Sequence, residues 1–372
     1  MFGDLLKDGL WIAFCSIVNH FPIGVNRGGF VNNQQNKEIA LWLSVCAVLI
    51  YGMVIIGGLT RLTDSGLSMV DWRPVLGWLP PMNLAEWEEV FARYQHSPQF
   101  KIVNHDMDLS GFKSIFWLEY IHRLLGRIVG VVFLLPLLYF IIRKKIHGRL
   151  AFGLSGIFVL GAIQGIIGWI MVQSGLVDTP QVSPYRLTLH LGFAVMIYAI
   201  ILWLALTAFN AKVGTHDSCK KMTVPTILLG MLIFVTILSG GLVAGLDAGL
   251  IFNTFPLMDG RFIPAEYMDY QPVHRAFFEH IPTVQWDHRV LALSVFSGVV
   301  LLWIALRRQI PQGTIRTLAH GLLFMAMVQV GLGIATLLLA VPIPLASMHQ
   351  GGALLLFTLN LMLVHRLVHR RV

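Results

Sequence analysis

Charged residues are scarce in this sequence. Only 12% of its 372 residues are Asp, Glu, Lys or Arg, whereas 56% are hydrophobic. Soluble globular domains carry about 25% charged residues, so this composition excludes an ordinary soluble enzyme. The formal net charge of +8 does not indicate a nucleic-acid-binding protein, because lysine and arginine gather in short segments between apolar runs.

Long apolar runs dominate the chain instead. Eight of them have about 20 residues, the length that an α-helix needs to cross a bilayer. We therefore predict an all-α integral membrane protein with eight transmembrane helices. The predicted spans cover residues 39–59, 115–141, 150–172, 187–208, 223–245, 287–306, 316–340 and 345–365.

The connections between the predicted spans alternate in charge. Lysine and arginine cluster after the second, fourth, sixth and eighth spans, whereas most acidic residues lie in the other connections. Because basic loops face the cytoplasm, both chain termini are predicted to be cytoplasmic. The basic residues include Arg143, Lys144, Lys145, Arg149, Lys212, Lys220, Lys221, Arg307, Arg308, Arg316, Arg366, Arg370 and Arg371.

Cysteines and targeting signals are also sparse. Of the three cysteines, Cys15 and Cys219 fall on the predicted cytoplasmic side and Cys46 falls within the first span. No cysteine pair is left for a disulfide in an outer loop. Residues 1–37 lack a signal-peptide cleavage site and an Arg- and Ser-rich transit composition. We predict that they form an interfacial or loosely ordered cytoplasmic leader.

The chain repeats one pattern in its two halves, and each half holds an even number of spans. We therefore predict two tandem four-helix bundles, related by duplication and inserted in the same orientation, over residues 38–210 and 211–372. The matching residues, first half before second, are Gly57 and Gly240, Gly58 and Gly241, Asp64 and Asp247, His122 and His288, Gln164 and Gln329, Gly168 and Gly333, and His190 and His349.

Four of the repeated positions are histidines near the start of apolar spans. Two histidines on facing helices inside a membrane are the axial ligands that a haem iron needs. The sequence therefore predicts two haem-sized sites near the outer interface, one formed by His122 and His190 and the other by His288 and His349. A single intramembrane histidine is often only an interhelical hydrogen-bonding residue, and the repetition at four positions favours ligands.

One residue distinguishes the two predicted sites. Glu119 precedes His122 by one helical turn on the same face, whereas the second half has Gln285 at that place. A carboxylate within a membrane is costly and usually functional. The difference predicts a catalytic haem site in the first half and an electron-transfer haem site in the second. The alternative is that Glu119 is a structural ion-pair partner of Arg123 or Arg127.

Six blocks of sequence are more distinctive than these patterns. They are Glu119-Tyr-Ile-His-Arg-Leu-Leu-Gly-Arg127, Gln285-Trp-Asp-His-Arg289, and residues 58–74, 100–106, 185–190 and 241–250. Together they resemble haem A synthase, in the branch found in mitochondria and proteobacteria, over about residues 40–365. Other branches carry a cysteine pair in an outer loop. This chain lacks one, so no disulfide chemistry is carried over.

The resemblance implies that a ring methyl of haem o is oxidised to a formyl group by successive hydroxylations, giving haem a for terminal oxidases. It also implies that the first-half histidine pair, with Glu119 as the catalytic residue, receives haem o, and that the second-half pair holds a permanent haem b. Arg123 and Arg289 are candidate partners of haem propionates, or else anchors of helix ends at the interface. The predicted iron ligands are His122, His190, His288 and His349.

Two other functions remain open from the sequence: a cytochrome b-like electron carrier with two bis-histidine haems, and a haem transporter or chaperone. The expected partners are haem o, haem o synthase, an electron-transfer protein and membrane lipid, with a homo-oligomer open and nucleic acid excluded. A bacterial inner membrane is the expected location, with the mitochondrial inner membrane as the alternative. Residues 83–94 are predicted to form an amphipathic helix that covers a site, docks a partner or lies on the membrane surface.

Overall fold

The computed structural model describes residues 33–72, 77–209, 220–309 and 313–368. In these ranges, eight helices are long and apolar enough to cross a membrane, which confirms the predicted all-α membrane architecture. Most of the predicted leader, together with Cys15 and Cys219, lies outside the described residues. The eight helices are α2 (Asn33–Leu62), α5 (Leu109–Ile142), α6 (Gly148–Gln173), α7 (Pro184–Phe209), α8 (Lys220–Gly245), α10 (Ile281–Gln309), α11 (Thr314–Leu338) and α12 (Ile343–Val368).

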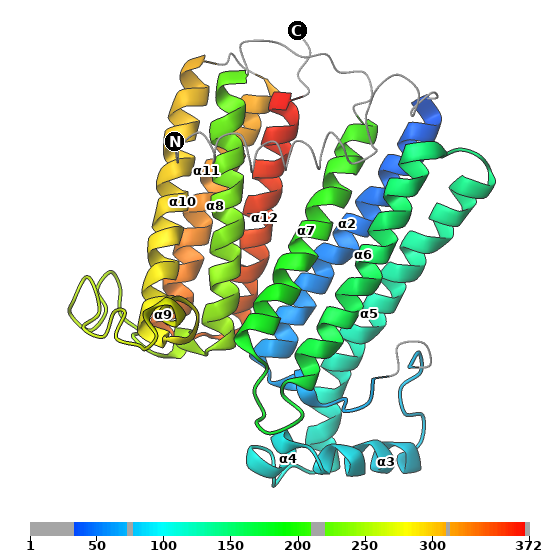
Figure 1. Ribbon diagram of the computed structural model, residues 1–372, viewed down its shortest axis with the longest axis vertical. Helices are drawn as coiled ribbons and strands as arrows, with labels where there is room; N and C mark the ends of the chain where they lie inside the picture. Colours follow the sequence, from blue (N-terminus) through cyan, green and yellow to red (C-terminus); the bar gives the residue numbers. More distant parts are fainter. Residues whose placement is uncertain (1–32, 73–76, 210–219, 310–312, 369–372) are drawn as a thin grey trace.

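The helices form two groups of four that stand side by side (Figure 1). One group contains α2, α5, α6 and α7, and the other contains α8, α10, α11 and α12. The start of α2 and the end of α12 lie at one end of the molecule, and the short helices lie at the opposite end. These short elements are α3 (Leu84–Gln95), α4 (Pro98–Ile102), α9 (Val273–Glu279) and the single 3₁₀ turns η1 (Ser65–Leu67) and η3 (Ala248–Leu250).

Helix α5 begins earlier than its apolar run indicates. It starts at Leu109 rather than at residue 115, because the side chain of Asp108 accepts a hydrogen bond from the backbone N–H of Gly111 at 2.7 Å and caps the first turn. His122 therefore lies about three and a half turns into its helix. The prediction that all four histidines lie in the first turns is wrong for this residue, whereas the other three lie within about two turns of their helix starts.

The extension of α5 beyond the predicted span is covered by helix α3. Trp87 and Tyr94 of α3 are buried against Phe112 and Phe116 of α5, and their rings pack edge-on or stacked. The predicted amphipathic helix over residues 83–94 is thereby confirmed. Its apolar face covers α5, and the three roles predicted for this helix stay predictions.

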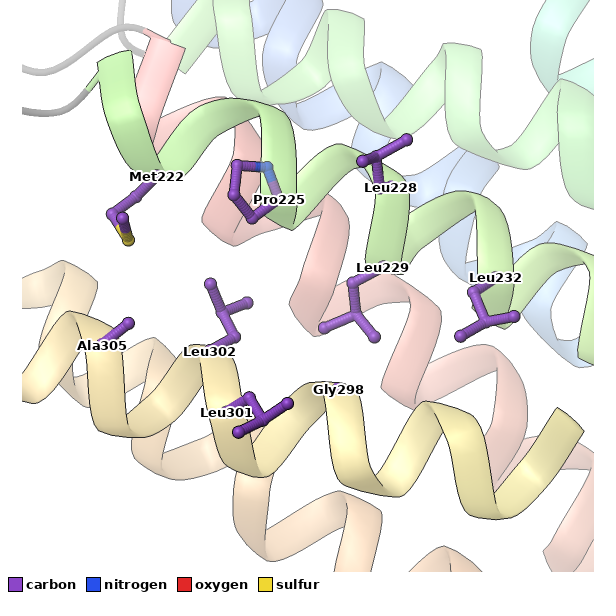
Figure 2. A pocket seen from close by; sticks show the side chains of 9 residues that line it. All are labelled: Met222, Pro225, Leu228, Leu229, Leu232, Gly298, Leu301, Leu302 and Ala305. Carbon is purple, nitrogen blue, oxygen red and sulfur yellow. The ribbon is translucent and has the colours of Figure 1, made fainter. Parts of the chain in front are cut away.

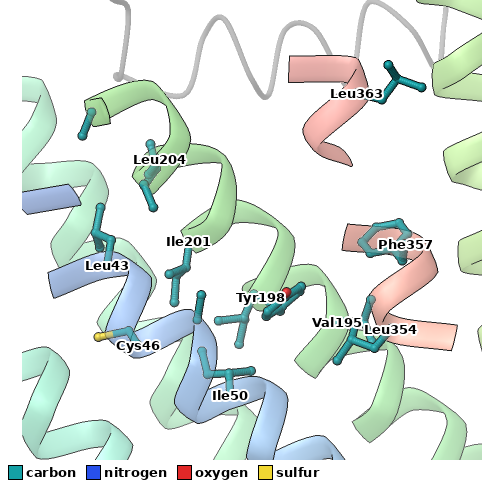
Figure 3. Close-up of a cluster of buried hydrophobic side chains, with 14 of the residues drawn as sticks. Leu43, Cys46, Ile50, Val195, Tyr198, Ile201, Leu204, Leu354, Phe357 and Leu363 are labelled. Atoms are coloured by element: carbon teal, nitrogen blue, oxygen red, sulfur yellow. The ribbon is translucent and has the colours of Figure 1, made fainter. Parts of the chain in front are cut away.

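The largest apolar core lies where the two groups of helices meet. Leu43 and Cys46 of α2, Ile201 of α7, and Leu354 and Phe357 of α12 all lie in this cluster (Figure 3). Cys46 is buried within the first span, as predicted. Burial of this many apolar side chains between α2, α7 and α12 joins the two halves into one unit.

Glycines allow the backbones of the two halves to approach closely. The second glycine of each Gly-Gly pair faces a side chain of the other half: Gly58 contacts the amide of Gln350, and a methyl group built on Gly241 would lie 3.1 Å from Oγ1 of Thr188. The Gln350 amide also donates to the backbone carbonyl of Val54 at 2.7 Å. These contacts fit the close helix packing for which small residues are used in membranes.

Candidate haem sites

The four histidines form one pair in each half. His122 on α5 lies close to His190 on α7, and His288 on α10 lies close to His349 on α12. Among the described residues no group of three or more His, Cys, Asp or Glu side chains is placed to hold a metal ion. Two axial imidazoles nevertheless suffice for a haem, because the porphyrin supplies the other four ligands. Each pair therefore supplies the two axial ligands that the predicted haem would need.

Each of the four imidazoles lies against a glycine of a neighbouring helix. Any larger side chain at these glycines would press on the ring, so the glycine fixes how closely the ring approaches the helix backbone. Sequence comparison between the halves finds these glycines but not this role. The distances from an added methyl carbon to Cε1 of the histidine would be 3.0 Å for Gly57 and His122, 2.8 Å for Gly168 and His190, 3.3 Å for Gly240 and His288, and 2.8 Å for Gly333 and His349.

Both imidazoles of the second half have a hydrogen-bonding partner at Nδ1. Ser239 Oγ lies 2.7 Å from Nδ1 of His288 and donates its own hydrogen to the carbonyl of Thr236, so it accepts from the ring. The amide nitrogen of Gln329 lies 3.0 Å from Nδ1 of His349 and also donates to the backbone carbonyl of that residue at 2.8 Å. Because an amide N–H only donates, Nδ1 of His349 is the acceptor here. Both contacts hold the ring in one orientation, but only the His288 ring donates its Nδ1–H, as metal-ligating histidines usually do.

The imidazoles of the first half lack this support. In the part of the chain that the structure describes, Nδ1 of His122 and Nδ1 of His190 are buried without a hydrogen-bond partner. Gln164, the counterpart of Gln329, donates to the backbone carbonyl of His190 at 3.0 Å but not to its ring. Position 56, which matches Ser239, is an isoleucine. The two pairs are therefore built from the same residue type but with different hydrogen bonding.

The carboxylate of Glu119 is only 3% exposed and accepts four hydrogen bonds. Oε2 accepts from the Ser68 hydroxyl at 2.7 Å and from the backbone N–H of Met69 at 2.8 Å. Oε1 accepts from Nη2 and Nε of Arg123 at 2.6 and 3.0 Å. Glu119 is thus an ion-pair partner of Arg123, as one of the two predictions holds, and it also binds the outer loop that follows α2.

Gln285 makes the matching contact in the second half, but it donates hydrogen bonds to its loop, whereas Glu119 accepts them. Its amide donates to the carbonyls of Ala248, at 2.7 Å, and Ile251, and its Oε1 accepts from Arg289 at 2.9 Å. An amide can donate, whereas a carboxylate can only accept. The choice between Glu and Gln therefore decides whether the loop presents donors or acceptors to the helix.

Arg123 and Arg289 hold the loops that follow α2 and α8 in the same way. Arg123 donates to the carbonyls of Met69 and Asp71 at 2.7 and 2.8 Å. Arg289 donates to the carbonyls of Phe252 and Thr254, again at 2.7 and 2.8 Å. The sequence indicated propionate partners or helix anchors here. It did not reveal that each arginine fastens the loop after the first helix of its half.

A carboxylate links the two halves at the end of the molecule that holds the short helices. The hydroxyls of Tyr185, from the first half, and Tyr270, from the second, donate to the two oxygens of Glu279 at 2.7 and 2.8 Å. These two hydrogen bonds hold the pKa of Glu279 below its ordinary value of 4.5.

The contact between Tyr185, Tyr270 and Glu279 predicts a pH dependence of stability. A carboxyl whose pKa is lowered by folding stabilises the fold above its ordinary pKa, and this contribution is lost as the pH falls through the lowered value. We therefore expect the unfolding temperature of the purified protein to fall below pH 4.5 in part because of Glu279. The acid-induced decrease should be smaller in the Glu279→Gln variant. An identical decrease in both proteins would exclude a contribution from this carboxyl.

An apolar groove of about 410 Å³ lies between α8 and α10 (Figure 2). It is lined by Met222, Leu229 and Leu232 of α8 and by Leu302 and Ala305 of α10, among others. These residues lie towards the opposite ends of their helices from His288 and Ser239. The groove is therefore separate from the histidine pairs.

Comparison with known proteins places these features in context. Residues 40–361 match the family described as cytochrome oxidase assembly protein (COX15-CtaA). The chain is 50% identical over 333 residues to the heme A synthase of Nitrosospira multiformis, which covers 89% of this chain and 94% of that protein. It is 46% identical over 337 residues to the heme A synthase of Nitrosomonas eutropha, covering 90% and 95%. It is 45% identical over 346 residues to that of Paramagnetospirillum magneticum, covering 91% and 96%.

Proposed function

Because this chain belongs to the COX15-CtaA family of cytochrome oxidase assembly proteins, we propose that its first-half histidine pair binds haem o and that its second-half pair holds haem b. The activity is haem A synthesis, carried out by an oxidoreductase that acts on haem o. Two successive hydroxylations of one ring methyl give a geminal diol, and loss of water from the diol leaves the formyl group.

The different hydrogen bonding of the imidazoles carries the assignment of the two halves. Metal-ligating histidines usually have their second nitrogen hydrogen-bonded, which fixes the ring. His288 meets that condition by donating to Ser239, and the His349 ring is held at Nδ1 by the Gln329 amide, as suits a permanently bound cofactor. The first-half rings, without such partners among the described residues, suit a haem that is bound and released at each turnover. Haem b supplies one-electron transfer when bound.

Glu119 is the catalytic carboxylate in this proposal. It lies one helical turn before His122, and its partner Arg123 balances its charge. We infer that it accepts a proton released at the methyl carbon or stabilises positive charge that develops there. To take up a proton, the carboxylate must give up one of its four hydrogen bonds. The bond from Ser68 is the one that can be released most easily, because a hydroxyl can rotate and backbone N–H groups cannot.

Arg123 and Arg289 keep enough hydrogen-bonding capacity to serve as propionate partners as well. A guanidinium has five N–H donors, and Arg123 directs four hydrogen bonds to Glu119, Met69 and Asp71. Arg289 directs three hydrogen bonds to Phe252, Thr254 and Gln285. We propose that a haem propionate accepts from the remaining N–H groups while the arginines continue to hold the outer loops.

We also propose that the enzyme lies in a bacterial inner membrane with both termini in the cytoplasm. Arg143, Lys144 and Lys145 directly follow α5, and Lys145 forms an ion pair with Glu38 near the start of α2. They therefore lie at the end of the bundle that holds the start of α2, and basic loops face the cytoplasm. Haem o synthase, as supplier of the substrate, and an electron-transfer protein are the partners that this reaction requires. The relatives described above come from bacteria.

Extraction of the bound haems tests the proposed function directly. We expect the protein, co-expressed with a supply of haem o and purified, to release haem b together with haem o, a hydroxylated intermediate and haem a on reverse-phase chromatography. Haem b alone, despite available haem o, would contradict haem A synthesis and favour a cytochrome b-like electron carrier. Exchangeable haem without any oxidised product would favour a haem transporter.

A further inference from the structure

Two tryptophans stack on each other at the outer end of the first half. Trp72 lies in the loop after η1, and Trp169 lies on α6 near the end of that helix. Their ring centroids are 4.9 Å apart, and the ring planes differ by 22°. Both residues remain accessible, with exposed fractions of 44% for Trp72 and 37% for Trp169. Aromatic side chains exposed near the end of a membrane helix contact lipid or a ligand.

The loop that carries Trp72 is fastened to the helix of His122. Glu119 accepts from Ser68 and Met69, and Arg123 donates to the carbonyl of Asp71, the residue before Trp72. Three residues of the loop are thus tied to one turn of α5. The position of Trp72 is therefore set by the same side chains that flank His122.

The partner ring lies on the helix that contacts the second histidine. Trp169 directly follows Gly168, the glycine against which the His190 ring packs. One turn earlier on α6, Gln164 donates to the backbone carbonyl of His190 at 3.0 Å. The stacked pair therefore connects α5, through the loop of Trp72, with α6, the helix that contacts His190 of α7.

The second half lacks this pair at the matching positions. The arginine contacts align Met69 with Phe252 and Asp71 with Thr254, so Phe255 corresponds to Trp72. Gly333 corresponds to Gly168, so Ile334 corresponds to Trp169. An isoleucine offers no aromatic face. Like Glu119 and the unsupported histidine rings, the tryptophan pair is a property of the first half.

We propose that the Trp72–Trp169 pair is a contact surface for haem o at the outer entrance of the first-half site. This inference rests on the proposed function, which assigns the substrate to that half. Indole rings favour the membrane interface, where a planar macrocycle carrying an isoprenoid tail arrives from the lipid. The exposed indole faces offer this macrocycle an apolar, flat contact before it reaches His122 and His190. The pair would raise the affinity for substrate without taking part in the oxidation.

The inference can be tested with the Trp169→Ile variant, which introduces the second-half residue. We expect the Kd for haem o, from absorption titration of the solubilised full-length protein, to rise roughly threefold to tenfold, as for loss of one aromatic contact. The KM should rise by a similar factor while kcat and the haem b content stay as in wild type. Trp72→Leu should raise the Kd and the KM to a similar extent. The double variant should raise them little further, since the two rings act as one unit.

Trp117→Leu is the matched control, because Trp117 is also partly exposed on the outer part of α5 but stands outside the pair. It should bind haem o as wild type does. Unchanged haem o affinity in Trp169→Ile would overturn the inference. A decrease in kcat with unchanged affinity would also overturn it, because it would show that the pair only stabilises the loop. In either case wild-type haem a formation would leave the proposed function intact. Failure of the wild-type protein to bind haem o would overturn both.

Discussion

Replacement of Glu119 by glutamine is expected to lower the rate of haem a formation by about 10²- to 10⁴-fold, the usual contribution of a general acid or base. The amide cannot accept a proton as a carboxylate does. It also cannot accept all four hydrogen bonds, because the amide NH2 group replaces one carboxylate oxygen and its N–H groups would face the N–H or O–H donors of the neighbours. Haem b content should stay unchanged, since Glu119 belongs to the other half. The measurement is single-turnover conversion of bound haem o, followed by chromatography of the extracted haems.

The Ser68→Ala variant is the matched control for this experiment. It removes one of the four donors from the Glu119 carboxylate but leaves the charge and the Arg123 ion pair. We expect a loss of less than about tenfold, in keeping with a single hydrogen bond to a charged group. Normal haem a formation by Glu119→Gln would remove the carboxylate from the mechanism and leave it a purely structural role in holding the loop.

Substitution of single histidines should show which histidine pair binds which haem. His288→Ala is expected to lose haem b and all haem a formation, because an axial ligand and the route for electrons disappear together. His190→Ala is expected to retain haem b and to lose haem o binding. Both results follow from the assignment of one haem to each pair. Pyridine haemochrome spectra and chromatography of the extracted haems measure the two contents independently.

His320→Ala provides the control for these substitutions. His320 lies on α11 outside both pairs, and its ring accepts a hydrogen bond from Trp303 at 3.0 Å. This variant should keep both haems and the activity. Loss of haem b from His190→Ala with haem b retained in His288→Ala would reverse the assignment of the two halves.

Apolar length was sufficient to predict the membrane helices, but not where each one ends. All eight spans are found close to their predicted positions, because about 20 apolar residues in a helix have few other stable environments. The first turns of α5 were missed, since they carry Ser110, Lys113 and Ser114. They are stabilised by the Asp108 cap and by packing against α3, which no hydropathy pattern records.

The candidate site was predictable as a set of residues but not as a set of contacts. Repetition between the halves singled out His122, His288 and the glycines, because residues at matching positions of a repeat are expected to have the same role. The hydrogen bond between His288 and Ser239 could not be found this way, since the counterpart of Ser239 at position 56 is apolar. The sequence also left open whether Glu119 is catalytic or structural. The structure shows the structural contacts, and catalysis by Glu119 remains a prediction.

The Gly57-Gly58 pair makes the two halves interdependent under selection. Gly57 contacts the ring of His122, and Gly58 contacts Gln350, the neighbour of His349. Any mutation that displaces this turn of α2 therefore disturbs both sites at once, so neither half is free to diverge as a separate module. Helix α6 packs on α5 and α7 within its own half. Residues around Gly168 are consequently the better place to begin when the enzyme is to be reprogrammed for a different macrocycle.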